Sequence, residues 1–183
     1  MHNKILSNIK SIISKEKPHF LLAISGGVDS MVLLDLFQKN NKILNFSVAH
    51  INHNYHSESK VMEDIVKVEC KKNQCRLIIK SLESTKITSN IESRLRKLRY
   101  NKLEEIRTEI SADYIVTAHH ADDQVETILM KILNSSGLDG MQGIRKINQK
   151  IIRPCRDISK KEIIDYANQN RLSYVNDPTN LDT

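Results

Sequence analysis

Residues 25–30 read SGGVDS and place two hydroxyl groups, two glycines and one carboxylate within six positions. They join an apolar run at 20–25 to a segment with helical spacing that begins at Val28. A glycine-rich turn at a helix N-terminus exposes backbone N–H groups, and the helix dipole adds partial positive charge. The glycines let a ligand approach the backbone closely, and the serines supply hydroxyl donors. The stretch is therefore predicted to bind phosphate groups.

Asp29 distinguishes this turn from the common nucleotide-binding loops. The turn has neither the lysine of the G-x-x-x-x-G-K-S/T loop nor the glycine spacing G-x-G-x-x-G. A carboxylate beside phosphates repels them unless a cation lies between, so Asp29 indicates a Mg²⁺ ion that bridges to a triphosphate. A simple aspartate cap at the helix N-terminus explains Asp29 but not the whole string.

A second group of chemical side chains lies in AHHADDQVET at 118–127. Asp122 and Asp123 stand four and three positions before Glu126, so on a helix each shares a face with it. Such carboxylates can hold Mg²⁺ or an ammonium group. The alternative is a solvated acidic helix start, which the helix dipole also favours.

Alternating strand and helix patterns predict how these groups are positioned. Short apolar runs rich in β-branched residues indicate buried strands, and longer segments with apolar 3–4 spacing indicate helices. The predicted strands are 20–25, 46–52, 75–80 and 113–119, and the predicted helices are 2–15, 28–39, 57–72, 91–110, 122–133 and 159–170. The alternation predicts an α/β fold, a Rossmann-like parallel sheet with helices on both faces and ligands at the carboxyl ends of its strands. The glycine-rich segment 134–150 is predicted to be a functional loop.

The composition favours one domain of a cytoplasmic protein. The 183 residues suffice for a full core. No apolar leader follows Met1 and no long uncharged run occurs, which argues against secretion and membrane insertion. Three cysteines, Cys70, Cys75 and Cys155, fit a reducing compartment. The net charge of +6 fits either a solvated lysine-rich surface or a polyanionic partner such as nucleic acid.

SGGVDS, in its strand–turn–helix context, resembles the signature of the PP-loop ATP pyrophosphatase family. The resemblance implies an adenine nucleotide α-hydrolase-like fold that binds ATP, cleaves it between the α- and β-phosphates and transfers AMP to an oxygen of the substrate. It also implies which residues hold the pyrophosphate part of ATP and its Mg²⁺. These are Ser25, Gly26, Gly27, Val28, Asp29 and Ser30, with Asp29 on the metal.

HHADDQVET together with SGGVDS resembles one branch of that family, the tRNA(Ile)-lysidine synthetases. Segments from about residue 18 to the end agree with the branch, namely AHINH (49–53), RKLRY (96–100), GLDGMQGI (137–144), 151–167 and VNDPTN (175–180). The resemblance implies a ligase that joins free L-lysine to the wobble cytidine of tRNA(Ile) with a CAU anticodon. ATP first adenylates the carbonyl oxygen at position 2 of cytosine, and the lysine ε-amine then displaces AMP.

The same resemblance assigns further roles in the site. Asp123 and Glu126 would hold the lysine substrate, and Arg96, rather than Arg99, is the favoured arginine beside the adenylate. Ala23, Ser25 and His50, at strand ends, would lie near adenine. The branch has an arginine and a glycine before its glycine loop where this chain has Asn134 and Ser135, which leaves the fine substrate geometry open.

The chain is interpreted as a PP-loop ATP-binding catalytic domain over 1–183, cut from a longer protein whose C-terminal tRNA-binding part is absent. On its own it is expected to bind ATP–Mg²⁺ but to ligate poorly, because much of the grip on tRNA is phosphate contact. The resemblance is compatible with a homodimer.

Four alternatives compete with this interpretation. The chain could be another PP-loop AMP-forming ligase, or an adenine-nucleotide-binding module without catalysis; HHADDQVET disfavours the first and an intact pyrophosphate loop the second. A zinc site at His50, His53 and His56 is disfavoured because the segment crosses from strand into loop. Thiolating members use tight cysteine pairs, and no C-x-x-C occurs here.

Overall fold

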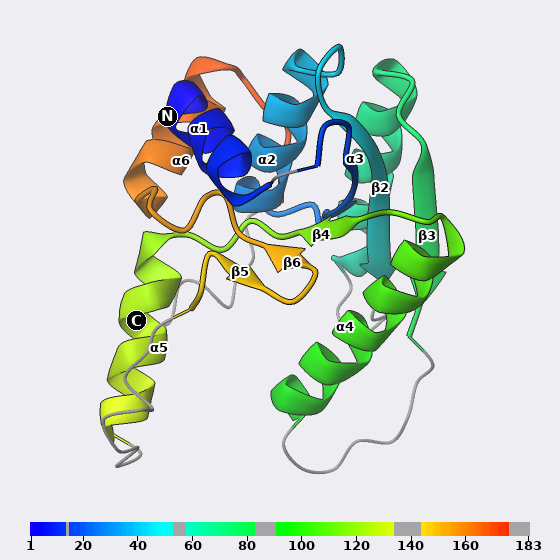
Figure 1. Ribbon diagram of the computed structural model, residues 1–183. Helices are drawn as coiled ribbons and strands as arrows, with labels where there is room; N and C mark the ends of the chain where they lie inside the picture. The colour runs from blue at the N-terminus through cyan, green and yellow to red at the C-terminus, as the bar shows by residue number, and fades with distance from the viewer. Residues whose placement is uncertain (14, 53–57, 83–90, 134–143, 176–183) are drawn as a thin grey trace.

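The computed structural model describes residues 1–13, 15–52, 58–82, 91–133 and 144–175 (Figure 1). In chain order, the elements are α1 (His2–Ile12), β1 (His19–Ala23), α2 (Val28–Lys39), β2 (Asn45–Asn52), α3 (Ser59–Lys72), β3 (Leu77–Ser81), α4 (Ile91–Glu109), β4 (Tyr114–Val116), α5 (Ala121–Leu133), β5 (Ile147–Asn148), β6 (Ile151–Ile152) and α6 (Lys160–Gln169). Among the described residues, none of the helices is both long and apolar enough to span a membrane.

The strands form one sheet in the order β3-β2-β1-β4-β6-β5. All neighbouring pairs are parallel except the edge pair β5–β6. The chain builds the sheet from β1 through β2 to β3 and then returns to place β4 on the other side of β1. This reversal makes a switch point between β1 and β4, where open α/β sheets bind ligands. The turns that follow β1 and β4 both leave the sheet at this point.

Alternate residues of β1 face opposite sides of the sheet, as the strand period of two requires. Phe20 and Leu22 belong to a core shared with α1, α2, α3 and α6, whereas Leu21 packs in a second core with Leu103 and Ile106 of α4. All five side chains are fully buried. Helices therefore cover both faces, while α5 extends away from the sheet (Figure 1).

The predicted α/β class, the four strands and the six helices are confirmed, with ends that shift by up to a few residues. Two predictions are wrong. The predicted strand 75–80 is not buried, because β3 lies at the edge of the sheet and its side chains are half-buried or exposed. Residues 147–148, assigned to the loop 134–150, form strand β5, in which Ile147 pairs with Ile152. Gln149 in the intervening turn has φ 52°, a left-handed conformation that glycine or asparagine usually signals. Residues 134–143 of that loop lie outside the described residues.

Candidate functional site

A cavity of about 280 Å³ opens at the switch point between β1 and β4. Its walls come from the ends of β1, β2 and β4, from the start of α2 and α5, and from one side of α4. The lining residues are Ala23, Ile24, Ser25, Asp29, Ser30, Ala49, Ile51, Arg99, Tyr100, Leu103, Thr117, Ala118, His119 and Asp123. Both sequence groups that were predicted to do chemistry, SGGVDS and HHADDQVET, therefore contribute to one cavity.

The turn after β1 depends on the absence of a side chain at Gly26. This residue has φ +99°, which L-amino acids with a Cβ rarely adopt. A Cβ placed there would lie 2.9 Å from the Cβ of Met62 and 3.0 Å from its carbonyl oxygen. Gly27, by contrast, has ordinary extended backbone and serves as the N-cap of α2 without a side-chain cap bond. The first backbone N–H groups of α2 therefore lie at the turn, and no N-cap side chain binds them.

Ser30 holds the turn together from inside. Its Oγ accepts hydrogen bonds from the backbone N–H groups of Ser25 and Gly26, each at 3.2 Å, and donates to the carbonyl of Gly27 at 2.9 Å. Ser30 is buried, whereas Ser25 is exposed. A distant segment adds a further restraint, because the N–H of Val175 donates to the carbonyl of Gly26 at 3.0 Å. The turn is therefore fixed on both sides.

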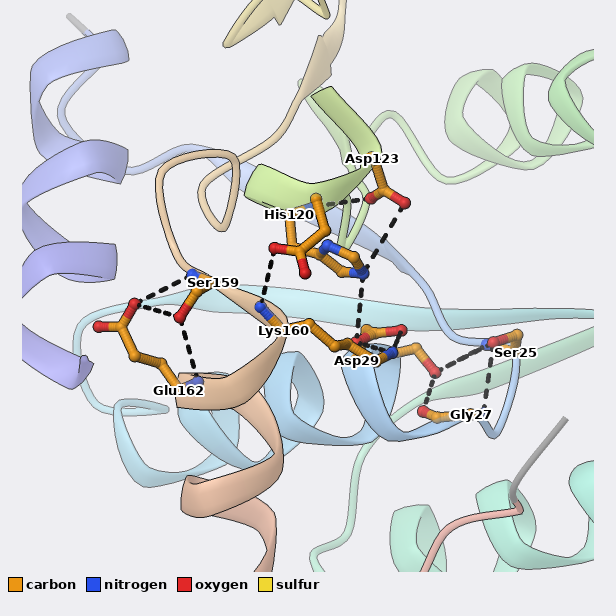
Figure 2. Close-up of polar contacts among 10 residues, drawn as sticks. Ser25, Gly27, Asp29, His120, Asp123, Ser159, Lys160 and Glu162 are labelled. Carbon is orange, nitrogen blue, oxygen red and sulfur yellow. Dashed lines mark hydrogen bonds and ion pairs between the residues drawn. The ribbon is translucent and has the colours of Figure 1, made fainter. Parts of the chain in front are cut away.

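Asp29 faces two cationic or polar partners from other elements (Figure 2). The ammonium of Lys160, the first residue of α6, lies 2.6 Å from one carboxylate oxygen and 2.8 Å from the other. His120 Nε2, from the turn after β4, lies 3.6 Å from the same carboxylate. Both Asp29 and Lys160 side chains are about a quarter exposed, at 27%. The starts of α2, α5 and α6 thus converge on one carboxylate.

The acids of HHADDQVET separate into different roles. Asp123 Oδ2 accepts the backbone N–H of His120 at 2.7 Å, so it caps the start of α5 while lining the cavity. Asp122 is exposed, and its Oδ1 accepts the backbone N–H of Lys160 at 3.2 Å. Glu126 is exposed on α5 and is not among the lining residues. Gln124 binds both backbone groups of Ile144, the first described residue after the glycine loop.

A basic group faces the cavity from α4. Arg99 lines the cavity, and Arg96 donates from Nη2 to His119 Nε2 at 3.4 Å. Burial and the neighbouring Arg153, Arg96 and Arg99 guanidinium groups lower the pKa of His119 to about 3. The imidazole is therefore neutral at pH 7. Because arginine can only donate, His119 accepts at Nε2 and carries its proton on Nδ1, which lies 2.9 Å from Thr117 Oγ1.

The low pKa of His119 predicts a pH-dependent stability. The folded state keeps the ring neutral down to about pH 3, whereas the unfolded chain takes up the proton near the ordinary value of 6.5. Between these values the unfolded state binds more protons, so the free energy of unfolding falls as the pH falls. His119→Asn removes this contribution. Between pH 7 and pH 5, thermal melts are expected to show a smaller loss of stability for the variant than for the wild type; equal losses would contradict a neutral His119 ring in the folded state.

Comparison with known proteins shows the family of the chain. The model of the PP-loop domain matches residues 1–183, the whole chain. The chain belongs to the PP-loop family. We interpret the turn at 25–30 as the PP loop, because it carries the string that resembles the family signature, and the cavity at the switch point lies where this turn begins α2.

Several known proteins are similar to this chain in sequence or in fold. The chain is 37% identical over 175 residues to a protein named tRNA(Ile)-lysidine synthase from Borrelia garinii subsp. bavariensis, covering 91% of the chain and 40% of that protein. It is 35% identical over 191 residues to the protein of the same name from Clostridium perfringens, covering 100% of the chain and 41% of that protein. The chain thus spans about two fifths of the length of these curated relatives. Among solved structures, the U34-tRNA thiolase NcsA from Methanococcus maripaludis matches with a TM-score of 0.82 at 20% identity, over 97% of this chain and 65% of that one, which shows a shared fold.

The structure brings most of the predicted PP-loop site residues together, but not all. Ala23, Ser25, Asp29 and Ser30 line the cavity, and Gly26 to Val28 form the turn beside it. His50 is buried, and its Nδ1 lies 2.9 Å from the carbonyl of Ile24, so it supports the strand end from behind. Arg96 reaches the cavity only through His119, whereas Arg99 lines it directly. The predicted roles of these residues stay predictions.

Several groups in the site carried no sequence signal of their own. Lys160 and Lys161 are adjacent in SKKE, and nothing in that pattern distinguishes the lysine that meets Asp29 from the exposed one. Tyr100 lines the cavity, and its hydroxyl is buried with no hydrogen-bond partner among the described residues. His120 Nδ1 is likewise buried and unpartnered within the part of the chain that the structure describes. Because Tyr100 lines the cavity, its unpartnered hydroxyl fits a cavity that receives a polar ligand.

The site fits a Mg²⁺ ion that is shared with a phosphate ligand. Within the described ranges, no three histidine, cysteine, aspartate or glutamate side chains gather as a metal cage. Mg²⁺ in nucleotide sites usually takes one or two carboxylates and fills its remaining positions with phosphate oxygens and water. Asp29 meets that need, since both its oxygens already bind a cationic group, the ammonium of Lys160. Asp29 is therefore the residue that would hold the metal.

Proposed function

We propose that this chain is the ATP-binding, adenylyl-transferring part of an enzyme that ligates lysine to the wobble cytidine of tRNA(Ile). The observation that carries the proposal is the meeting of the PP loop and the HHADDQVET helix start in one cavity at the switch point. The curated relatives, which are named tRNA(Ile)-lysidine synthase, share 35–37% of their matched residues with this chain and support the choice of substrate.

The cavity has an apolar part and a polar part, which match the adenine and the triphosphate of ATP. Ala23, Ala49 and Leu103 offer an apolar surface suited to adenine, and Ser25, Asp29 and Ser30 lie at the polar end. The triphosphate would follow the PP loop, where backbone N–H groups at the start of α2 favour negative charge. Bound Mg²⁺ would neutralise part of the phosphate charge at Asp29. This orientation turns the α-phosphate toward α4 and its arginines.

The first bond change is adenylation of the tRNA. The oxygen at position 2 of the wobble cytosine attacks the α-phosphorus, and the bond to the bridging oxygen breaks, so pyrophosphate leaves with the electron pair. Arg99, which lines the cavity, can stabilise the charge that develops at the α-phosphate. The neutral His119 ring accepts from Arg96 and so orients a second guanidinium beside it. These groups are in place before the substrate binds, so they need no reorganisation during the reaction.

The second bond change joins lysine to the base. The ε-amine attacks carbon 2 of cytosine, the bond from that carbon to the AMP oxygen breaks, and the amine loses a proton. Asp123, at the cavity wall, is placed to attract an ammonium group of the substrate and to help remove a proton from its attacking amine. Glu126 lies one turn further along α5, outside the cavity. There it can attract the α-ammonium group of a lysine substrate that extends out of the cavity.

The cysteines of the chain support ligation over sulfur transfer. All three are free, and burial raises the pKa of both Cys70 and Cys155 to about 12. The pKa of Cys75 is also raised by burial. The reactive form of cysteine is the thiolate, so these thiols are poor nucleophiles at neutral pH.

Exchange of labelled pyrophosphate into ATP tests this function. The chain, at a concentration comparable with that of the tRNA, is expected to catalyse exchange when tRNA(Ile) with a CAU anticodon is added, and without any need for lysine, because adenylation precedes lysine attack. A tRNA with uridine at the wobble position is the matched control and should support none. ATP binding without exchange, or exchange that needs a small acid and no tRNA, would overturn the proposal in favour of a binding module or another ligase.

A further inference from the structure

The PP loop itself contains no lysine, yet the fold delivers one to it. Lys160 lies 131 positions after Asp29 in the sequence, and its ammonium contacts both oxygens of that carboxylate, at 2.6 and 2.8 Å (Figure 2). The carboxylate in turn lines the cavity. A cation thus already occupies the place beside the loop where a metal–phosphate group is expected.

The backbone of Lys160 is held firmly at this place. Ser159 and Glu162 form a capping box, in which Glu162 N–H donates to Ser159 Oγ at 3.2 Å and Ser159 N–H donates to Glu162 Oε2 at 3.0 Å. The N–H of Lys160 donates to Asp122 at 3.2 Å. The start of α6 is therefore tied to the start of α5, and only the flexible side chain of Lys160 has freedom to move.

The ion pair is not needed to dock α6 on the sheet. Ile163 and Ala167 of α6 are buried in the core, and Tyr166 donates to Asp35 of α2 at 2.7 Å. These contacts already join α6 to α2, far from the loop. Lys161, the next residue, is exposed. A lysine that the packing does not require, and that meets the cavity carboxylate, points to a role with ligand.

We propose that Lys160 is the phosphate-binding cation of the PP loop. In the absence of nucleotide its ammonium neutralises Asp29. With a metal-bound triphosphate in the cavity, Asp29 would hold the metal, and the Lys160 ammonium would be free to donate hydrogen bonds to the β- and γ-phosphate oxygens. After cleavage the same ammonium faces the pyrophosphate, whose negative charge has risen. The inference rests on the proposed function, since it assigns this lysine to the leaving group of the adenylation step.

Binding measurements by calorimetry separate this role from a structural one. The variants are Lys160→Met, Lys160→Arg and, as the matched control, Lys161→Met, and the probes are ATP, pyrophosphate and AMP, each with Mg²⁺. Lys160→Met is expected to bind ATP and pyrophosphate about ten- to a hundredfold more weakly, because a charge-assisted hydrogen bond is lost. Its affinity for AMP, which lacks the terminal phosphates, should stay close to that of the wild type. Lys160→Arg should keep most of the affinity, and Lys161→Met all of it.

The outcomes keep this inference apart from the proposed function. Unchanged binding of ATP and pyrophosphate by Lys160→Met, or an equal loss for AMP, would overturn the role of Lys160 alone. A loss confined to ATP and pyrophosphate in a chain that shows no tRNA-dependent exchange would support Lys160 and overturn the proposed ligation. A wild-type chain that binds neither ATP nor pyrophosphate would overturn both.

Discussion

Replacing Asp29 with alanine is expected to reduce tRNA-dependent ATP–pyrophosphate exchange by about a hundredfold or more, the loss typical of a deleted electrostatic stabiliser. Asp29 is the carboxylate of the PP loop, it lines the cavity, and both its oxygens face a cation. Without it the metal loses its protein ligand, and the ammonium of Lys160 is left without its carboxylate partner. Initial rates of exchange measure the effect.

The matched control for Asp29 is an aspartate outside the cavity. Asp64 on α3 is exposed and pairs with Lys67 only at 3.8 Å. Asp64→Ala should leave the exchange rate unchanged, since an exposed ion pair of this kind contributes little to stability. Exchange by Asp29→Ala that stays within a few-fold of the control would contradict the placement of the metal at this carboxylate.

Replacing Gly26 with alanine is expected to destabilise the chain and to weaken ATP binding together. The left-handed backbone at φ +99° costs an alanine about 1–3 kcal/mol. The new Cβ would also lie 2.9 Å from the Cβ and 3.0 Å from the backbone carbonyl oxygen of Met62. For a chain of this length, such a loss lowers the melting temperature by about 2–12 °C. Relief of the clash would shift the turn that begins α2, so the nucleotide should bind more weakly as well.

Gly27→Ala is the control for stability in the same turn. A Cβ at Gly27 meets nothing nearer than Ser25 Oγ, at 3.6 Å, and its backbone is extended, at φ −77°. Thermal melts should therefore place Gly27→Ala close to the wild type and Gly26→Ala well below it. Equal melting temperatures for the two variants would show that the conformation of Gly26 is not required by the fold.

Local signals in the sequence were enough to predict the helices, the first four strands and both halves of the site. The α2 prediction at 28–39 matches the observed helix, because the glycine turn marks its start and an almost continuous apolar pattern marks its length. The short β-branched runs predicted β1, β2 and β4, because buried parallel strands are apolar on both faces, and they also predicted the edge strand β3. Open parallel sheets bind ligands at the carboxyl ends of their strands, and this rule predicted that SGGVDS and HHADDQVET meet at one site.

Contacts between distant segments could not be predicted in this way. The pairing of Lys160 with Asp29 depends on how α6 packs against α2, and two adjacent lysines look alike until that packing is known. The choice between Arg96 and Arg99 depends on the rotation of α4 about its axis, which turned Arg99 to the cavity. The edge strand β5 is two residues long and lacks a glycine turn, so no periodicity or turn signal marks it.

A structure of the chain with Mg²⁺ and α,β-methylene-ATP tests the central claim most directly. The account predicts adenine against Ala23 and Ala49, the terminal phosphates against the backbone of residues 26–30, the metal on Asp29, and the ammonium of Lys160 turned from Asp29 to a phosphate oxygen. A nucleotide bound elsewhere, or a PP loop that stays empty with Asp29 still paired to Lys160, would contradict it.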